Sequence, residues 1–206
     1  MKLNFDEFTN DIIVHNGSVV MTRGEEPYFM ELFSSLSRLQ PKRVLEIGYG
    51  LGISASLIQK HLSPATHIIV EIEEQIGRNA QNFASNHQGV EVITKDWFDV
   101  EFKGTFDFIF LDPFDYINAG SRTKDDVSNK IKNLLSYDGV LSHPHFGDGE
   151  VSHYNDLPYQ IIKRFKTEGF TTGDGVSCQE VASLIRCKNE NALKKALKRL
   201  QFPELK

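Results

Sequence analysis

The segment that most constrains the fold of this chain is Val44-Leu45-Glu46-Ile47-Gly48-Tyr49-Gly50-Leu51-Gly52. Its first half predicts a buried strand over residues 43–47, and its second half predicts a glycine-rich turn that leads into a helix over residues 52–61. Glycines after a strand permit positive φ angles and allow a ligand to approach the backbone closely, while the helix that follows offers unpaired N–H groups. This strand, turn and helix unit is therefore expected to bind a polar ligand.

Apolar strand patterns and amphipathic helix patterns alternate along the rest of the chain. Strand 67–71 is nearly all apolar, as expected when both faces of a parallel sheet are covered. Helix 27–39 begins at Pro27, whose missing N–H costs nothing in a first turn. The other expected helices are 5–14 (followed by a turn at His15-Asn16-Gly17), 74–85, 124–135, 156–169 and 189–201, and the other strands are 90–93, 106–111, 140–142, 176–181 and 182–187. This order indicates one α/β domain with a doubly wound, mostly parallel sheet and an antiparallel edge strand.

The charge balance limits the kinds of partner. The 206 residues carry a net charge of −5, and residues 188–206 hold six basic and two acidic residues, which leaves −9 on the rest. Such an acidic body is poorly suited to a phosphate backbone and better suited to a cationic small molecule. No apolar run approaches the roughly 20 residues of a membrane span, and the N-terminal segment carries acids, so we expect a cytoplasmic protein that does not bind membranes. Cys178 and Cys187 predict neither a disulfide framework nor a metal cluster.

The glycine spacing distinguishes between two classes of nucleoside-binding enzyme. NAD-binding folds use G-x-G-x-x-G, whereas this turn has G-x-G-x-G with Glu46 two residues before the first glycine. This form resembles the first motif of class I S-adenosylmethionine (SAM) dependent methyltransferases, in which the turn holds the methionine end of the cofactor. The resemblance implies a Rossmann-like methyltransferase fold, with SAM as cofactor and S-adenosylhomocysteine as product.

Carboxylates follow three further strands, at the edge where open parallel sheets bind their ligands. Glu71 ends the second strand, about 20 residues after the turn, where it can accept hydrogen bonds from ribose hydroxyls. Asp96 follows the third strand, where SAM enzymes contact the adenine amino group, with Trp97 either beside that ring or in the core. Asp112 follows the fourth strand and is expected to point into the same crevice as Glu46 and the turn.

Several further segments narrow the resemblance to one group of SAM-dependent methyltransferases. Met21-x-x-x-Glu25-x-Pro27-Tyr28 is similar to the Met-x-x-Trp-Glu-x-Pro-Tyr of the guanidinoacetate N-methyltransferase group, which has relatives that methylate arginine side chains. Residues 44–50 are similar to its Val-Leu-Glu-Val-Gly-Phe-Gly, and residues 67–71 and 106–112 resemble its second and fourth strands. The resemblance covers roughly residues 20–190. It implies methyl transfer to a guanidino nitrogen of a guanidinoacetate-, arginine- or agmatine-like small molecule.

Carried over residue by residue, the resemblance implies two groups of site residues. Glu25 would anchor the guanidinium and Asp112 would act as general base, because carboxylates match a guanidinium fork and can take up the proton that the attacking nitrogen loses. The residues expected to bind the cofactor are Met21, Glu46, Gly48, Tyr49, Gly50, Gly52, Ile53, Glu71, Ile72, Lys95, Asp96, Trp97 and Asp112. Those expected to bind the acceptor are Glu25, Tyr28, Asp112, His145, Phe146 and Gly147.

The chain departs from the family pattern around the acceptor. Gly24 replaces the family tryptophan, and Glu26 replaces a threonine. The family's Cys-Asn-Leu-Thr loop, which receives the carboxylate of the small acid, has become Pro144-His145-Phe146-Gly147. Backbone amides at the end of this loop could still bind a carboxylate, with His145 assisting. The acidic surroundings make a larger or more cationic substrate at least as plausible as guanidinoacetate.

Other interpretations stay open at the level of sequence. Asp112-Pro113-Phe114 resembles the Asp-Pro-Pro-Tyr motif of methyltransferases that act on amino groups of bases or on protein glutamine, although this chain has no basic patch outside its last helix. A non-catalytic SAM-binding module, for instance the inactive partner in an oligomer, is a further alternative. The glycine spacing disfavours an NAD-linked oxidoreductase. His143, His145 and His153 match no standard zinc pattern, so no metal is expected.

The chain divides into three expected parts. Residues 1–22 form a lid segment that orders over the cofactor, and residues 23–188 form the methyltransferase domain. Residues 189–206 form a basic amphipathic helix, which we expect to dock on its own domain rather than on a membrane. A homodimer is compatible with the sequence, which does not specify the oligomeric state.

Overall fold

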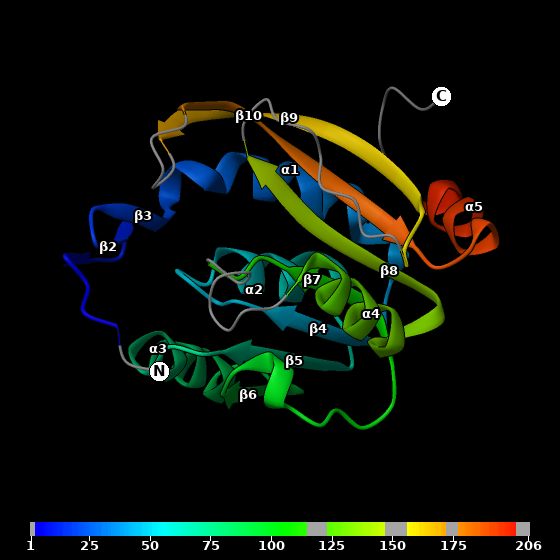
Figure 1. The fold of residues 1–206 in the computed structure, drawn as a ribbon, viewed down its shortest axis with the longest axis horizontal. Coiled ribbons are helices and arrows are strands. Elements are labelled where there is room, and N and C mark those ends of the chain that lie inside the picture. Colours follow the sequence, from blue (N-terminus) through cyan, green and yellow to red (C-terminus); the bar gives the residue numbers. More distant parts are fainter. Residues whose placement is uncertain (1–2, 115–122, 147–155, 172–176, 201–206) are drawn as a thin grey trace.

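The computed structural model describes residues 3–114, 123–146, 156–171 and 177–200 (Figure 1). Within them, a seven-stranded sheet has the order β6-β5-β4-β7-β8-β10-β9. Its strands are β4 (Arg43–Ile47), β5 (Thr66–Glu71), β6 (Val90–Thr94), β7 (Phe106–Leu111), β8 (Leu135–Phe146), β9 (Tyr159–Thr171) and β10 (Ser177–Cys187). Strands β4 to β8 run parallel, whereas β10 pairs antiparallel with β8 and β9. The predicted α/β fold is confirmed, with the antiparallel strand β10 one position in from the edge that β9 occupies.

Helices pack on both faces of this sheet. One face carries α1 (Glu26–Leu36), α2 (Ile53–Leu57) and α3 (Glu74–Ser85), together with α5 (Glu190–Arg199). The other face carries α4 (Lys124–Leu134), whose Val127 and Ile131 belong to the same core cluster as Leu45 and Leu141. Alternating side chains of each parallel strand point into the two hydrophobic cores, one on each face, as in a sheet that is buried on both faces. Helix α2 continues into a π-helical turn, η3 (Ile58–Leu62). These helices confirm the predictions over residues 27–39, 52–61, 74–85, 124–135 and 189–201, apart from a few residues at their ends.

The N-terminal segment forms a separate antiparallel sheet of β1 (Glu7–Phe8), β2 (Ile12–His15) and β3 (Ser18–Thr22). The predicted helix over residues 5–14 is therefore wrong, because the β-branched run in β2 favours an extended chain. The predicted turn is confirmed, since Asn16 and Gly17 have φ angles of 51° and 74°, as a two-residue hairpin requires. Ile13 is fully buried in a cluster with Tyr49, so this sheet docks where β4 ends, on the left in Figure 1.

The predicted helix over residues 156–169 is wrong, because strand β9 takes its place. Its apolar residues Ile161, Ile162 and Phe165 fit helical spacing as well as strand spacing, so the pattern alone does not separate the two. In the structure, Ile162 is 45% exposed and Phe165 is 1% exposed, in the alternation of a strand that pairs with β10 along its length. The two strands predicted over residues 176–187 are the single strand β10.

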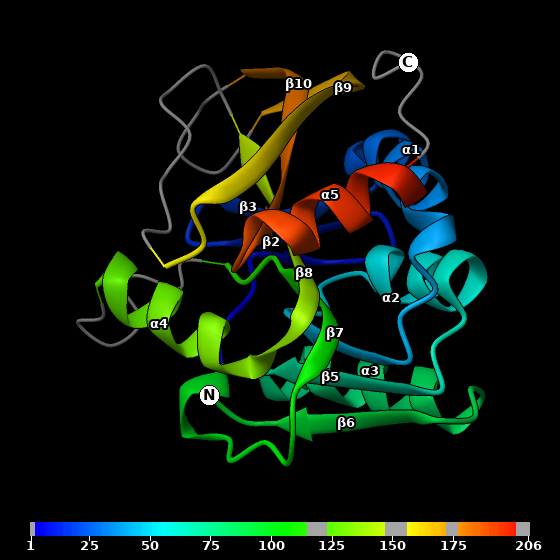
Figure 2. The same cartoon turned by 90° about the vertical axis from the view of Figure 1, so that its right-hand side faces the viewer.

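Helix α5 docks on its own domain, as predicted. Asn189 caps it by accepting the N–H of Ala192 at 2.8 Å. Ala192 and Ala196 are buried in the same core cluster as α1, and the helix lies against β8 and β10 (Figure 2). None of the described helices is both long enough and apolar enough to cross a membrane.

Candidate active site

The turn after β4 has the geometry that its glycines predict. Gly48 and Gly50 have φ angles of 91° and 53°, a region that other residues rarely adopt. Gly48 donates its N–H to the carbonyl oxygen of Val70 at 2.9 Å, and a Cβ atom on Gly48 would lie 2.5 Å from the carbonyl oxygen of Asp112. The turn is thus fixed between the ends of β5 and β7, at the carboxyl ends of the parallel strands.

Met21 reaches over this turn from β3. Its sulfur accepts the N–H of Leu51 at 3.0 Å, and a Cβ atom on Gly50 would overlap with the same sulfur. Met21 is 7% exposed, and the neighbouring Tyr49 and Ile53 are buried as well. Predicted cofactor residues from two separate segments, Met21 and the turn, are therefore in contact.

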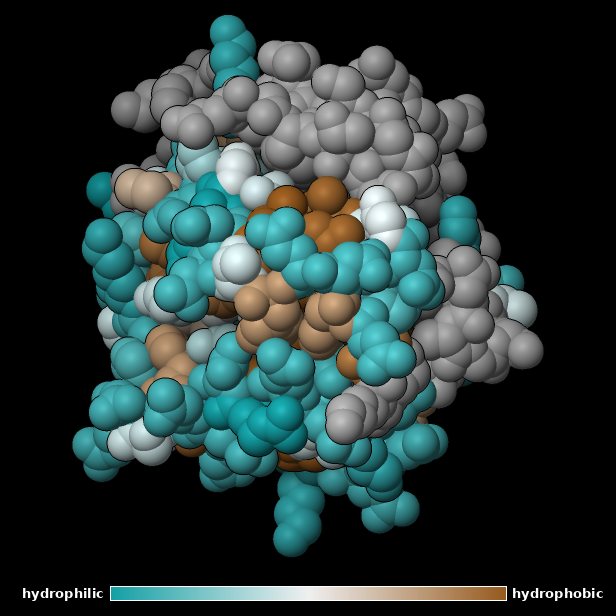
Figure 3. All heavy atoms as spheres, turned by 90° about the vertical axis from the view of Figure 1, so that its left-hand side faces the viewer, coloured by the Kyte–Doolittle hydropathy of each residue, from teal (hydrophilic) through white to brown (hydrophobic). Residues whose placement is uncertain are grey.

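Figure 3 views the side of the molecule that lies to the left in Figure 1, where the surface is largely hydrophilic with hydrophobic residues gathered near its middle.

Glu71 joins the turn to the connection between β5 and α3. Its Oε2 accepts the N–H of Tyr49 and its Oε1 accepts the N–H of Glu73, both at 2.9 Å. Burial raises the pKa of Glu71 above its usual value, and these hydrogen bonds act in the opposite direction. The N–H of Ile72 also bonds to this carboxylate, so three of its roughly four acceptor sites are taken and one is left for a further hydroxyl. Ile72 lies half-buried directly after it.

The residues predicted near adenine follow β6. Asp96 caps the short helix η4 (Trp97–Asp99), with its Oδ1 accepting the N–H of Phe98 at 2.9 Å. The ammonium of Lys95 donates to the carbonyl oxygen of Asp99 at 2.7 Å. Trp97 is 5% exposed and packs in the core cluster on the α4 face, which is one of its two predicted roles. Contact of these side chains with adenine stays a prediction.

Glu25 and Asp112 enter the site from different elements. Glu25 ends the short helix η1 (Arg23–Glu25), where its Oε1 accepts the N–H of Thr22 at 3.0 Å in a capping box. Asp112 follows β7, and its N–H donates to the carbonyl oxygen of Ile47 at 3.0 Å. Asp112 therefore lies at the end of β7, and its charge acts on Glu25; that the two carboxyls form one site stays a prediction.

Both carboxyls hold protons more tightly than free side chains do. Burial, followed by the charge of Asp112, raises the pKa of Glu25 to about 8. Burial, followed by the charge of Glu46, raises the pKa of Asp112 to about 7. Within the described ranges, no lysine, arginine or histidine forms an ion pair with Glu25 or Asp112. A cation bound between them would lower both pKa values, so the site is electrostatically suited to a guanidinium.

Tyr28 adds a buried hydroxyl beside these carboxyls. The side chain is fully buried, and its hydroxyl has no hydrogen-bond partner in the part of the chain that the structure describes. Burial, with the charges of Asp112 and Glu25, raises the pKa of Tyr28 well above its usual value. Its ring stands edge-on to Phe146, with centroids 6.5 Å apart. Because an unpaired buried hydroxyl costs about 1–3 kcal/mol, a substrate group that bonds to it would be favoured.

The acceptor residues predicted on β8 divide between its two faces. Phe146 packs toward Tyr28 and the core cluster of α1. The next residue back, His145, alternates to the α4 face, where its charge acts on His143. Gly147 lies outside the described residues. The structure thus brings Phe146, but not the imidazole of His145, to the side of the strand that holds Tyr28.

The histidines considered as metal ligands have other surroundings. Arg186, which is 1% exposed, donates its Nε–H to Nε2 of His143 at 3.0 Å. Burial and the charge of Arg186 lower the pKa of His143 to about 3, so this imidazole is neutral. No group of three His, Cys, Asp or Glu side chains gathers as a metal site among the residues described, and His153 lies outside them.

Glu46, predicted to bind the cofactor, is fully buried under the turn. One of its oxygens accepts the hydroxyl of Ser54, and the other lies 2.9 Å from Nε2 of His67. A role of Glu46 toward the cofactor stays a prediction, because this structure places both oxygens against protein groups. Sequence reasoning missed His67 here and Arg186 on β10. The signal common to both is a polar side chain within an otherwise apolar strand.

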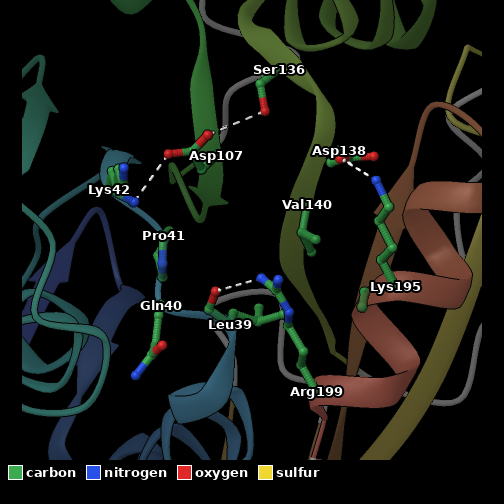
Figure 4. A pocket seen from close by; sticks show the side chains of 11 residues that line it. Leu39, Gln40, Pro41, Lys42, Asp107, Ser136, Asp138, Val140, Lys195 and Arg199 are labelled. Carbon is green, nitrogen blue, oxygen red and sulfur yellow. Dashed lines mark hydrogen bonds and ion pairs between the residues drawn. The ribbon is translucent and has the colours of Figure 1, made fainter.

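A hollow of about 310 Å³ lies at the opposite end of the sheet, where the parallel strands begin (Figure 4). It lies between α5 and the strands, and two of the cations that line it have partners within the protein. Lys195 pairs with Asp138 at 2.6 Å, and Arg199 donates to the carbonyl oxygen of Leu39 at 3.3 Å. Open parallel sheets bind their ligands at the carboxyl ends of the strands, so we place the candidate active site at the glycine turn instead.

Comparisons with known proteins identify the family and the fold of this chain. The family model described as guanidinoacetate N-methyltransferase matches residues 2–170. Spermidine synthase from Thermotoga maritima superposes with a TM-score of 0.63 at 18% identity, covering 95% of this chain and 72% of that chain. The N-methyltransferase NodS from Bradyrhizobium japonicum WM9 superposes with a TM-score of 0.61 at 13% identity, covering 80% of this chain and 99% of that chain. At these identities, the likeness to solved structures shows the fold.

Proposed function

Because this chain belongs to the guanidinoacetate N-methyltransferase family, whose members use SAM to methylate a guanidino nitrogen, we propose that Glu25 and Asp112 form its acceptor site. The turn after β4 and Glu71 form the cofactor site in this proposal. The observation that carries it is the pair of buried carboxyls with raised pKa values, at the same end of the sheet as the glycine turn. A pair of this kind is completed by a cation.

The residues around the turn fit SAM. Gly48 and Gly50 let the turn pass close beneath the Asp112 carbonyl and the Met21 sulfur, which a Cβ atom at either position would prevent. Glu71 keeps about one acceptor site, which would bind a ribose hydroxyl. Met21 and the sheet β1–β3 would close the turn from the other side, which is the role expected of a lid. SAM, when bound, supplies an electrophilic methyl group on a sulfonium.

Glu25 and Asp112 would hold the guanidinium from two sides. A carboxylate accepts two parallel N–H bonds from a guanidinium, and two such contacts fix the plane of the group. Fixing that plane directs one nitrogen toward the methyl group, which converts an encounter into a positioned attack. The unpartnered hydroxyl of Tyr28 would accept a further N–H from the same group.

Asp112 would take up the proton of the attacking nitrogen. A guanidinium nitrogen has a usable lone pair only as it loses a proton, and a general base works best with a pKa near the operating pH. The pKa of Asp112, raised to about 7, meets this condition. Glu25, with its pKa raised to about 8, holds a proton near neutral pH in the free protein and would release it as the guanidinium binds. Glu25 is therefore the anchor and Asp112 the base.

We infer that the far end of the acceptor is cationic or neutral. Pro144 has no backbone N–H, so β8 offers one donor fewer for a carboxylate at this position. The half-buried ring of Phe146 lies there instead, edge-on to the buried ring of Tyr28. These features favour agmatine or arginine over guanidinoacetate as the acceptor.

Methyl transfer from labelled SAM, with mass detection of the product, tests this function. The acceptors are guanidinoacetate, arginine, agmatine, an arginine-containing peptide, a simple amine and a catechol. We expect turnover of guanidino compounds only, with agmatine and arginine ahead of guanidinoacetate. Asp112→Asn should lower kcat by about 10²–10⁴-fold, the range for loss of a general base. Glu25→Gln should mainly raise KM for the acceptor.

Glu26→Gln is the matched control for Glu25→Gln. The side chain of Glu26 is 43% exposed and pairs with Arg23, so its neutralisation should change neither kcat nor KM. Intact SAM binding without turnover of any guanidino compound would contradict the proposed acceptor site and favour a non-catalytic module. Turnover of simple amines alone would favour the alternative suggested by Asp112-Pro113-Phe114.

A further inference from the structure

A lysine of α4 holds the short helix η4 that follows β6. The ammonium of Lys130 donates to the carbonyl oxygen of Phe98 at 2.6 Å. The same ammonium lies 5.6 Å from the centroid of the Trp97 ring and 5.2 Å from that of the Phe98 ring. A cation this close to two aromatic rings adds a cation–π attraction to the charge-assisted hydrogen bond. Lys130 therefore fastens η4 to a helix that lies 32 residues further along the chain.

The strand end before η4 is anchored beside the proposed ribose ligand. Lys95 donates its backbone N–H to the carbonyl oxygen of Glu71 at 3.0 Å, and its ammonium to the carbonyl oxygen of Asp99 at 2.7 Å. Two ammonium groups thus bind carbonyl oxygens at the end of η4, where a helix has no N–H partners of its own to offer. The segment that carries Asp96 is held from β5 on one side and from α4 on the other.

One residue connects Lys130 to Asp96. Phe98 donates its backbone N–H to Oδ1 of Asp96 at 2.9 Å, and its carbonyl oxygen accepts the ammonium of Lys130. Asp96 is half-buried, so protein contacts orient its carboxylate while part of the side chain remains exposed. Because both backbone groups of Phe98 are engaged, a displacement of Phe98 would turn the carboxylate of Asp96.

We propose that Lys130 is a positioning residue for cofactor binding, which fixes η4 so that Asp96 can accept the amino group of adenine. This inference rests on the predicted contact between Asp96 and adenine in the proposed cofactor site. An acceptor that is already held in its bound orientation loses little freedom when the ligand arrives, whereas a mobile carboxylate must first be ordered. Lys130 is therefore expected to affect recognition of the adenine amino group more than affinity for the rest of the cofactor.

Calorimetry with two ligands tests this inference: S-adenosylhomocysteine, and its analogue in which hydrogen replaces the adenine amino group. The unmodified protein should bind the first about 10- to 100-fold more tightly, the range for one hydrogen bond to a charged group. Lys130→Met removes the ammonium and should bring this ratio to about threefold or less, because the carboxylate is no longer held in place. Lys130→Arg keeps a cation with N–H donors and should retain most of the ratio. Asp96→Ala should abolish the ratio, and adding Lys130→Met should change it no further.

Lys132→Met is the matched control on the same helix. The side chain of Lys132 is 45% exposed and pairs with Asp156 at 3.0 Å, so its removal should leave the ratio within about twofold. Trp97 is the only tryptophan in the chain, so its fluorescence reports on η4 in each variant. Its emission should shift in Lys130→Met but not in Lys132→Met. An unchanged emission in Lys130→Met would show that η4 keeps its place without the ammonium, and would overturn the proposal.

An equal loss of affinity for both ligands in Lys130→Met would show a merely structural lysine and also overturn the proposal. Equal affinity of the unmodified protein for the two ligands would do the same, because Asp96 would then not bind the amino group. If Lys130→Met does not fold, Lys130→Gln decides, since glutamine keeps this half-buried position polar but is uncharged and too short to reach Phe98. An unchanged ratio in that variant overturns the proposal.

Failure of this inference is distinguishable from failure of the proposed function. The titrations contain no acceptor, so an absence of guanidine turnover would count against the acceptor site and leave the ligand ratio measurable. An absence of S-adenosylhomocysteine binding to the unmodified protein would overturn the proposed cofactor site and this inference together. Binding with a ratio that is the same in Lys130→Met would overturn this inference alone.

Discussion

The carboxylate of Glu71 accepts the backbone N–H of Tyr49 at 2.9 Å, across 22 residues of sequence. This contact joins the end of β5 to the glycine turn after β4. The side chain proposed to bind the ribose hydroxyls therefore also holds the turn proposed to bind the rest of the cofactor. Under this proposal, cofactor affinity and turn geometry would both depend on Glu71.

Glu71→Ala should weaken SAM binding by about 10- to 100-fold, because hydrogen bonds to a charged group contribute about 1.5–3 kcal/mol. Isothermal titration calorimetry measures the affinity directly. The control is Glu74→Ala, which removes an exposed acid in the first turn of α3 and should leave the affinity within about twofold. Equal SAM affinity in Glu71→Ala and the unmodified protein would exclude Glu71 as a ribose ligand.

Gly50→Ala tests how Met21 packs on the turn. An alanine at a φ of 53° is strained, and its Cβ atom would overlap with the Met21 sulfur. We expect a loss of about 2–4 kcal/mol in the free energy of unfolding, measured by urea denaturation. Adding Met21→Ala should recover the part that comes from the overlap, since the two changes share one contact.

Gly17→Ala separates backbone strain from overlap. Gly17 has a φ of 74°, and a Cβ atom there would have nothing within 4 Å. The substitution should therefore cost only the strain of a left-handed alanine, about 1 kcal/mol. Equal losses at Gly17 and Gly50 would mean that the Met21 side chain moves aside without cost, and the proposed closure of the turn by Met21 would lose its support.

The parallel half of the sheet could be predicted from the sequence, whereas its flanks could not. Residues 43–47, 67–71 and 106–111 lie within one residue of β4, β5 and β7, because strands buried on both faces are almost wholly apolar and end at glycines or carboxylates. The runs in β2 and β9 are short enough to fit helical and strand spacing alike. Their partners decide between the two: β10 lies beside β9, and β3 lies beside β2.

The carboxylates of the site could be placed because the carboxyl ends of parallel strands meet at one edge, whatever the details of the loops. The surroundings of Glu46 could not be predicted from the sequence. Its contact with His67 depends on the register of β4 against β5 and on both side chains facing α2, which no sequence spacing specifies. The orientation of His145 likewise depends on the alternation along β8, whose length the sequence did not reveal.

The free protein should lose stability as the pH rises from about 4.5 to about 8. The pKa of Glu25 is raised from 4.5 to about 8 and that of Asp112 from 3.8 to about 7, so the folded state binds more protons than the unfolded state in this window. The free energy of unfolding therefore falls as these protons leave. Urea denaturation over this pH range should give a flatter profile for the Glu25→Gln, Asp112→Asn double variant. Glu26→Gln should keep the full slope, and an equally steep slope in the double variant would show that other groups titrate.

Binding of a guanidino cation should release protons near neutral pH. Glu25, with its pKa raised to about 8, is mostly protonated at about pH 7, and a bound guanidinium stabilises its ionised form. Calorimetric titration with agmatine in two buffers of different ionisation enthalpy measures the release, which we expect to lie between about one and one and a half protons per agmatine at about pH 7, because Asp112 is half protonated there, and to vanish well above pH 8. Glu25→Gln should remove most of it, while Glu26→Gln should leave it unchanged. A binding enthalpy that is the same in both buffers would mean that both carboxyls are already ionised before the cation arrives, and the anchor role of Glu25 would then lack its electrostatic basis.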